Sequence, residues 1–248
     1  MDKLALIGAL IAFAALLGGN ALEGGSASAL FDLPALIIVL GGTVGAVILQ
    51  TPIDVLRRAM RMLPWLVNPP EDQVRSTVRQ ITEWSKTTRR EGFLGLERIL
   101  EREREPFRAK GLALVVDGAE PQSVRRILQV EAERRLEDAL VASSVFHSLG
   151  GYAPTVGIIG AVLGLIQVMG NLTNPDQLGP GIATAFVATI YGVASANLIF
   201  LPIADRLKSI VYRQANELNL YIEGMSALSE GEHPSAVELR LSSYAATP

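Results

Sequence analysis

The 248-residue sequence contains no cysteine and only two histidines, His147 and His233, which lie far apart. The lack of cysteine excludes a disulfide framework and a thiolate metal site, and two isolated histidines do not form a metal-ligand pattern. The motifs GxxxxGK[ST], HExxH and GxSxG are also missing, so no nucleotide loop, zinc protease site or serine nucleophile is indicated. Nothing in the sequence therefore points to an enzyme, a metal site or a resident cofactor.

Charge is also scarce, because 19% of the residues are charged and 49% are hydrophobic. The hydrophobic residues gather into four runs, two of them before residue 50 and two between Gly150 and Ile203. A transmembrane helix needs about 20 predominantly apolar residues, so the four runs predict four membrane spans. We expect an all-α integral membrane protein with four transmembrane helices and a large cytoplasmic helical domain.

The changes in composition predict four segments along the chain. Residues 1–50 hold the first two transmembrane helices with a short periplasmic loop, and residues 51–149 form a charged cytoplasmic helical domain. Residues 150–204 hold the third and fourth transmembrane helices. Residues 205–248 form a cytoplasmic C-terminal helix and tail, and the segment that begins at Pro234 is expected to form one more helix.

The first apolar run is a weaker candidate for a membrane span than the second. Leu4–Leu17 is short for a span, and the Ser-Ala-Ser-Ala stretch at 26–29 resembles a signal-peptidase site. The N-terminus carries both Asp2 and Lys3, whereas a signal peptide begins with a cluster of positive charges. The first run is therefore expected to be retained as a membrane span. The second run, Leu33–Leu49, follows Asp32, an expected helix cap, and has Pro34 in its first turn.

The positions of lysine and arginine predict the orientation in the membrane. Seventeen of the 22 lie in residues 51–149, four lie after residue 204, and the other is Lys3. The loops at 20–32 and 171–180 carry none. Because lysine and arginine concentrate on the cytoplasmic side, both termini and the large loop are expected in the cytoplasm of a multi-pass inner-membrane protein.

The stretch from Gly150 to Ile203 contains no charged residue except Asp176, which is placed in a turn. Gly160 and Gly164, and the row Thr184, Ala188 and Gly192, repeat every four residues, a spacing that permits close packing of two membrane helices. A protein that moves ions unaided usually carries an ionisable group inside the membrane. An autonomous pump is therefore disfavoured, and these helices are expected to shape a site rather than carry a full relay themselves.

Several motifs follow one another along nearly the whole chain: LIIVLGGTVGAVILQTP, RREGFLGLE at 89–97, GGYAPTVGIIGAVLGLIQVM, GPGIATAFVATIYGVASANLIFLPIADRL and HPSAVELRL. In this order they resemble the MotA/PomA stator subunits of the bacterial flagellar motor, and a MotC-type paralogue fits equally well. The resemblance implies that residues 150–204 form the wall of an ion pathway. The resemblance implies a homo-oligomer of five subunits around two copies of a MotB-type partner. That partner would supply the aspartate that binds the ion, and no nucleic-acid partner is implied.

The resemblance also implies roles for particular residues. Thr189 matches the position that faces the partner's carboxylate, and Pro154 and Pro202 match two prolines used in conformational change. Arg89, Glu97 and the neighbouring Arg90 match the charges presented to the rotor protein FliG. Arg89 and Glu97 are eight residues apart, so on one continuous helix they would share a face.

Ala161 and Ala188 bear on the choice of transported ion. Sodium-driven members of the family resemble this chain but carry hydroxyl groups at these two positions. Sodium needs several oxygen ligands to replace its hydration shell, whereas a proton needs only the carboxylate. We therefore expect proton rather than sodium transport.

Two other functions are compatible with the pattern of apolar runs. An ExbB/TolQ-type proton-channel subunit, which energises an envelope transducer, shares the small-residue helix pair but normally has three spans. The retained first span argues against it. A passive membrane scaffold without ion flux is the other alternative, and it predicts that Thr189→Ala affects only packing and expression.

Overall fold

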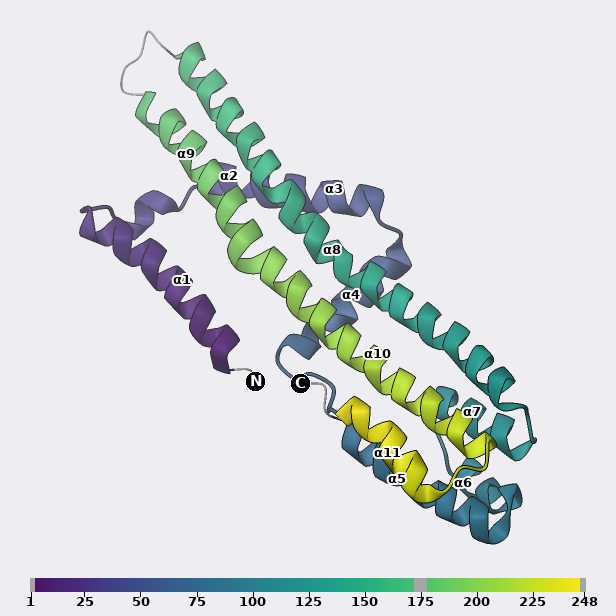
Figure 1. Ribbon diagram of the computed structural model, residues 1–248. Coiled ribbons are helices and arrows are strands. Elements are labelled where there is room, and N and C mark those ends of the chain that lie inside the picture. The colour runs from purple at the N-terminus through teal and green to yellow at the C-terminus, as the bar shows by residue number, and fades with distance from the viewer. Residues whose placement is uncertain (1–2, 172–177, 246–248) are drawn as a thin grey trace. The chain divides into compact units, whose positions relative to one another are not determined.

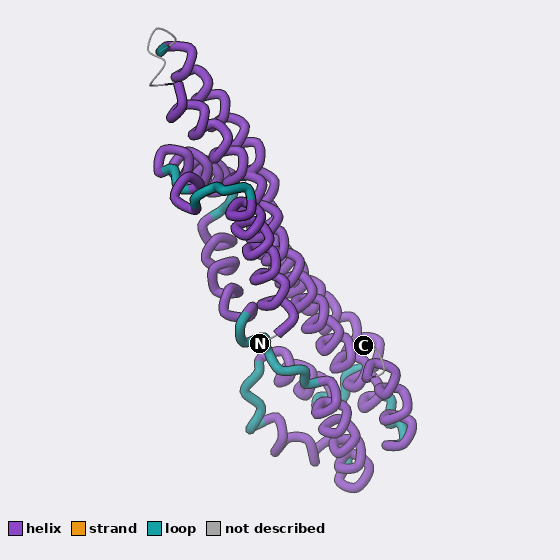
Figure 2. Tube along the Cα trace, turned by 90° about the vertical axis from the view of Figure 1, so that its left-hand side faces the viewer, coloured by secondary structure: helices purple, strands orange, loops and turns teal. Residues whose placement is uncertain are grey.

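The computed structural model describes residues 3–171 and 178–245, and this part of the chain is helical with no strand (Figure 2). Asp176, which we placed in the turn between the last two spans, lies outside the described residues. Two compact units are present, and each combines segments that are distant in sequence. Residues 1–69 and 140–208 form the first, here called the membrane unit, and residues 70–139 and 209–248 form the second, which we call the cytoplasmic unit after the location expected from the sequence.

The membrane unit begins with helix α1, Lys3–Leu22, followed by the 3₁₀ turn η1, Ala27–Leu30. The second expected span is a helical stretch in three pieces: α2 (Leu33–Leu36), the π-helical turn η2 (Ile37–Gly41) and α3 (Gly42–Gln50). Asp32 caps this stretch through a 2.8 Å hydrogen bond from the Ala35 amide, and Pro34 lies in its first turn, as predicted. A short helix, α4 (Ile53–Met62), and the 3₁₀ turn η3 (Leu63–Leu66) complete the N-terminal part.

The third and fourth expected spans are parts of longer helices. Helix α8 runs without a break from Pro121 to Gly170, and α9 (Leu178–Ser195) continues through the π-helical turn η6 (Ala196–Phe200) into α10 (Leu201–Ser229). In the membrane unit α9 lies beside the C-terminal part of α8 (Figure 1). Ala35 and Val39 pack against Val187 and Ala188 of α9.

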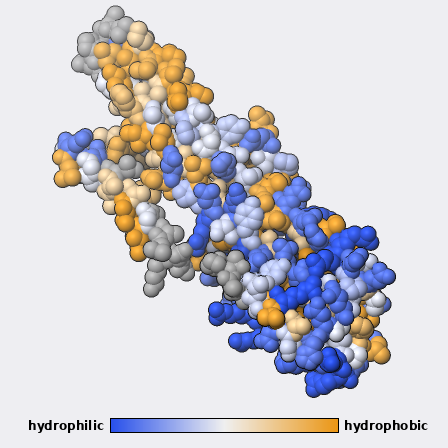
Figure 3. Space-filling view, in the orientation of Figure 1, coloured by the Kyte–Doolittle hydropathy of each residue, from blue (hydrophilic) through white to orange (hydrophobic). Residues whose placement is uncertain are grey.

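Three helical stretches of the described chain are long and apolar enough to cross a membrane: Leu33–Gln50, a window within Pro121–Gly170 and a window within Leu178–Ser229. By the same measure α1 contributes a shorter apolar stretch, Leu10–Leu22. The surface over α9 and the adjoining end of α8 is largely hydrophobic (Figure 3). The protein is therefore helical with three long apolar helices, and the helix expected over Leu4–Leu17 is present within α1.

The cytoplasmic unit contains α5 (Val74–Glu91), the 3₁₀ turn η4 (Phe93–Leu96), α6 (Glu97–Leu100), α7 (Pro106–Val116) and α11 (Pro234–Ala245). They surround the N-terminal part of α8 and the C-terminal part of α10. The core is built from large side chains, among them Tyr221, whose ring centroid lies 6.4 Å from that of Trp84 and 5.7 Å from that of Phe107. The late helix expected after the proline at 234 is present as α11.

Candidate functional site

The seam between α8 and α9 is built from glycines that face backbone atoms. A side-chain carbon on Gly157 would lie 2.9 Å from the Ala188 carbonyl oxygen and 3.1 Å from the Gly192 Cα. One on Gly164 would lie 2.9 Å from the carbonyl oxygen of Gly181. Distances this short leave no room for a methyl group, so the two helices approach as closely as their backbones allow. The close packing predicted from the spacing of small residues is present.

The three expected ion-pathway residues occupy different surfaces of one subunit. Ala188 is fully buried in the seam, where its methyl group faces Gly160, and Ala161 is half-buried on the next position of α8. Thr189 is half-buried and its hydroxyl donates to the Ala185 carbonyl at 3.2 Å, within its own helix. It lines an apolar groove of about 550 Å³ between α9 and α1. A single chain therefore does not bring the three together into one cavity.

Pro154 lies on α8, and Pro202 lies in the first turn of α10, the helix that continues α9. The Pro154 Cα is 3.2 Å from where a Gly192 side-chain carbon would stand, and Gly150 faces the side chain of Leu201, the residue before Pro202. Helix α8 continues through Pro154, while the π-helical turn Ala196–Phe200 ends two residues before Pro202. A proline removes one helical hydrogen bond, and a π-helical turn is one way for a helix to absorb such a defect.

A polar contact between α2 and α9 was not predicted. Asp32 Oδ2 accepts a 2.6 Å hydrogen bond from the Thr184 hydroxyl while Oδ1 caps α2. The Tyr191 hydroxyl donates to the Leu30 carbonyl at 2.6 Å and accepts from the Asp32 amide at 3.1 Å. Thr184 and Tyr191 are seven residues apart and so share a face of α9. That spacing was the available signal, but their common partner is about 150 residues away in sequence.

The expected rotor-contact residues lie at the end of α5 and the start of α6. Arg89 and Arg90 are exposed in the last turn of α5, and Glu97 is exposed as the first residue of α6. Within the described chain their side chains form no ion pair or hydrogen bond. Arg89 and Glu97 do not lie on one continuous helix, because Gly92 adopts φ +71° and a 3₁₀ turn follows it. A break here suits glycine, since this backbone conformation is costly for other residues.

Helix α5 packs against α11. Arg240 of α11 forms ion pairs with three carboxylates. Its guanidinium donates to Glu232 at 2.6 Å, Glu223 at 3.0 Å and Glu230 at 3.1 Å. Burial alone would lower the pKa of Arg240, but the hydrogen bonds to Glu230 and Glu223 outweigh it and raise the pKa. The backbone carbonyl of Glu232 also accepts from the Ser85 hydroxyl of α5 at 3.3 Å. Of these contacts, the Ser85 hydrogen bond joins α5, whose last turn carries Arg89 and Arg90, to the segment between α10 and α11.

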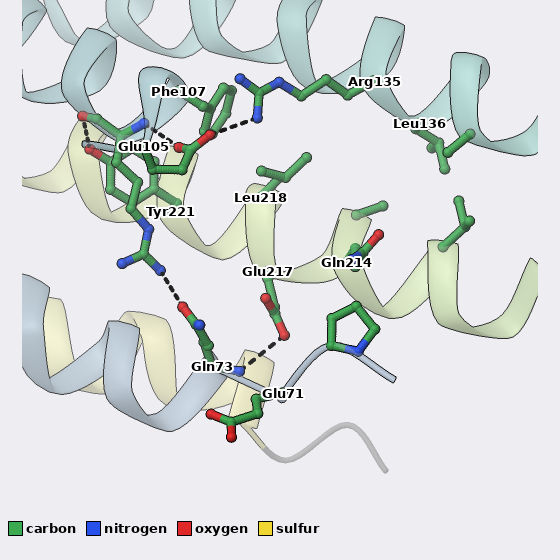
Figure 4. Close-up of a pocket in the computed structure, with 15 residues that line it drawn as sticks. Glu71, Gln73, Glu105, Phe107, Arg135, Leu136, Gln214, Glu217, Leu218 and Tyr221 are labelled. Atoms are coloured by element: carbon green, nitrogen blue, oxygen red, sulfur yellow. Dashed lines mark hydrogen bonds and ion pairs between the residues drawn. The ribbon is translucent and has the colours of Figure 1, made fainter. Parts of the chain in front are cut away.

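A hollow of about 350 Å³ lies in the cytoplasmic unit between α7, α8, α10 and the segment before α5 (Figure 4). Several charged groups at the hollow are engaged: Arg135 bridges Glu105 and Glu131 at 2.9 Å, and Glu217 accepts from the Gln73 amide at 3.0 Å. Burial raises the pKa of the Glu217 carboxyl, and the nearby Asp72 adds to the rise. No His, Cys, Asp or Glu cluster of three or more that could hold a metal ion occurs among the described residues.

Comparison with known proteins places the chain among membrane channel subunits. Residues 100–219 match the MotA/TolQ/ExbB proton channel family, and residues 6–92 match the motility protein A N-terminal family. Motility protein A of Bacillus subtilis is 34% identical over 98% of this chain and 91% of its own length.

Two solved structures have the same fold. The flagellar MotAB stator complex from Bacillus subtilis matches with a TM-score of 0.85 at 33% identity, covering 96% of this chain and 94% of that chain. The C. jejuni MotAB structure matches with a TM-score of 0.91 at 25% identity, covering 98% and 96%. The likeness covers both units of the chain.

Proposed function

Since the chain belongs to the MotA/TolQ/ExbB proton channel family as a MotA-like member, we propose that it is a stator subunit of a bacterial flagellar motor. With a MotB-type partner it forms a channel that converts ion-motive force into torque. It is a multi-pass membrane protein of a channel family and not an enzyme. The observation that carries the proposal is the uncharged seam of α8 and α9, whose glycines meet backbone atoms along several turns.

The seam supplies shape but no ionisable group, and this explains the need for a partner. Apart from Asp176, residues 150–203 contain no Asp, Glu, Lys, Arg or His. An ion crossing the hydrocarbon region needs a group to bind it, and in the proposed complex the partner's helix supplies that aspartate. Five copies of this chain surround two copies of the partner, so that the surfaces bearing Ala188 and Thr189 become parts of one composite pathway.

The transported ion is proposed to be the proton. Alanines at 161 and 188 leave the Thr189 hydroxyl and backbone carbonyls as the nearby oxygen atoms, which is too few to replace the hydration shell of sodium. A proton that falls through ~100 mV releases ~2.3 kcal/mol. Neutralising the partner's aspartate changes its preferred contact with the ring and turns the ring, with Pro154 and Pro202 accommodating the change in helix shape.

In the proposed topology, α1 and the three long apolar helical stretches make four spans. Both termini lie in the cytoplasm of a cell with an inner membrane. The 20-residue length of α1 supports its role as a span, because a helix rises 1.5 Å per residue and so reaches about 30 Å, the thickness of the hydrocarbon core. The arginine-rich cytoplasmic unit then faces the rotor. Exposed Arg89, Arg90 and Glu97 contact FliG there, and such weak, salt-screened contacts can be remade at each step.

Proton flux through the purified complex tests the channel function. The chain and its partner, with the partner's plug removed, are reconstituted into vesicles that contain a pH-sensitive dye. Wild type should acidify the lumen, and Thr189→Ala should lower the rate about tenfold, while Thr189→Ser, which keeps the hydroxyl, should retain most of it. No flux in any variant would indicate a passive scaffold, and flux that requires sodium would overturn the choice of proton.

Swimming assays test the rotor contact separately. The double reversal Arg89→Glu with Glu97→Arg should reduce torque several-fold while the amount of membrane-assembled complex stays unchanged. Arg126→Glu with Glu133→Arg is the matched control, because both residues are exposed on α8 in the same unit. Normal swimming of the first variant with an unmodified rotor would refute the assignment of these residues.

A further inference from the structure

Helix α4 is held close to the end of the second span. Only Thr51 and Pro52 separate its first residue, Ile53, from Gln50, the last residue of α3. Three Cα–Cα steps reach about 10 Å at most. The Tyr152 hydroxyl donates to the Gln50 side-chain oxygen at 3.0 Å, which joins the end of α3 to α8. If α3 crosses the bilayer, α4 therefore lies at the bilayer surface.

The outer face of α4 mixes apolar and cationic side chains. Its inner face is buried through Ala59 and Met62, whereas Ile53 and Met60 are 60% and 61% exposed. Arg57 and Arg61 are exposed beside them, one helical turn apart. In water, exposed isoleucine and methionine gain nothing, but at a bilayer surface they can enter the acyl boundary while arginines stay among the phosphates.

Both arginines are available for a ligand. Arg57 approaches Asp54 only at 4.0 Å, and their side chains are 67% and 89% exposed, so water screens this pair strongly. Arg61 forms no ion pair or hydrogen bond with any residue that the structure describes. A guanidinium group binds phosphate oxygens through two parallel hydrogen bonds, a geometry that suits lipid headgroups.

We propose that α4 lies in the headgroup layer of the cytoplasmic leaflet and that Arg57 and Arg61 bind the phosphates of anionic phospholipids. This inference rests on the proposed orientation of the second span. The occupant is lipid and not a second copy of the chain, because the short link keeps the start of α4 at the bilayer and its exposed face combines apolar side chains with a net positive charge. Bound anionic lipid holds α3 at a fixed depth in the membrane relative to α8.

Trp65, in the turn directly after α4, reports on this contact. The chain contains one other tryptophan, Trp84, which is buried in the cytoplasmic unit. The purified complex with its partner is placed in phosphatidylcholine vesicles that contain a minority of phosphatidylglycerol, and either lipid carries bromine, which quenches nearby tryptophan. Trp65→Phe identifies the part of the signal that comes from this residue.

Quenching by brominated phosphatidylglycerol should exceed the value expected from its mole fraction, because each arginine near an anionic surface favours contact about fivefold. Arg57→Gln with Arg61→Gln should remove the excess. Arg75→Gln with Arg79→Gln should keep it, since these are an equally spaced exposed pair on α5 of the cytoplasmic unit. An unchanged excess in the first variant, or no Trp65-dependent quenching by either lipid, would overturn the proposal.

Two further readouts separate the explanations. If Arg57→Gln with Arg61→Gln lowers the number of subunits in the complex and leaves lipid enrichment unchanged, α4 contacts a second copy and the proposal is wrong. Proton flux is measured in the same vesicles. In the wild-type complex, no enrichment together with normal flux counts against this inference alone, whereas no flux together with normal enrichment counts against the proposed channel function alone.

Discussion

Glycine residues pack against different kinds of atoms in the two units. In the membrane unit Gly157, Gly164 and Gly192 face backbone atoms of the opposing helix. In the cytoplasmic unit Gly111 faces the ring of Tyr221, the end of a side chain. Helices in a lipid environment gain little from hiding apolar surface and so depend on close fit, whereas the cytoplasmic unit gains from burying large apolar side chains in water.

The two units also use charge differently. In the membrane unit one carboxylate, Asp32, is held by Thr184 and by the amide of Ala35. In the cytoplasmic unit Arg240 and Arg125 share Glu223, and Arg240 reaches two further glutamates. The closely packed backbones of the membrane unit cannot move to accommodate an added group. In a network of exposed charges, the loss of one side chain leaves the other ion pairs in place. Substitutions in the membrane unit should therefore have the larger effects.

The largest expected effect is that of Gly192→Ala. The added methyl group would lie 2.5 Å from the Ala153 carbonyl oxygen and 3.2 Å from the Pro154 Cα, and backbone atoms cannot move aside as a side chain can. Overpacking of this kind costs about 3 kcal/mol, and we expect assembled complex and proton flux to fall at least about tenfold. Gly151→Ala is the control, because no atom lies within 4 Å of the new carbon. Equal behaviour of the two variants would contradict the role of the seam.

Thr184→Val should have the next largest effect. It removes the 2.6 Å hydrogen bond to Asp32 while keeping the shape of the side chain. A hydrogen bond to a charged group contributes about 2 kcal/mol, so the contact of α2 with α9 should loosen. Hydrogen exchange at the start of α2 should become faster. Thr155→Val, which loses only a bond to the Tyr152 carbonyl in its own helix, should leave that exchange unchanged.

Arg240→Gln should cost the cytoplasmic unit about 1 kcal/mol, because partly exposed ion pairs are screened by water. Thermal unfolding of the complex at low and high salt measures this. The loss should shrink at high salt, whereas that of Gly192→Ala should not change, since it is steric. A salt-independent loss at Arg240 would mean that side-chain packing matters more than charge.

Glu217→Gln should have the smallest effect and should depend on pH. Burial raises the pKa of Glu217, so the folded state disfavours its charged form. The stability that this group contributes is present at low pH and is lost as the pH rises through the raised pKa. The variant should therefore unfold about 2 °C higher than wild type at pH 8, with little difference at pH 5. A larger difference at pH 5 would contradict the direction of the shift.

Local signals in the sequence predicted much of the fold. Asp32 and Pro34 marked the start of the second span, and the proline at 234 marked the start of α11. The four-residue spacing of glycines predicted the seam. The break after α5 carried a signal in Gly92 that the spacing argument for Arg89 and Glu97 overlooked, because the charges were compared as if one helix joined them. The π-helical turns had no local signal that distinguished them from ordinary helix.

By itself, the sequence determined that apolar runs form helices, that the last two runs lack charge, and that glycines recur at a spacing that allows close packing. These properties depend on neighbours within one or two helical turns. Only the tertiary structure decided that Gly192 faces the Ala153 carbonyl, that Thr184 reaches Asp32, and that α4 presents arginine beside exposed apolar side chains. Such contacts depend on the register between helices that lie far apart in the chain, and spacing within one helix cannot specify that register.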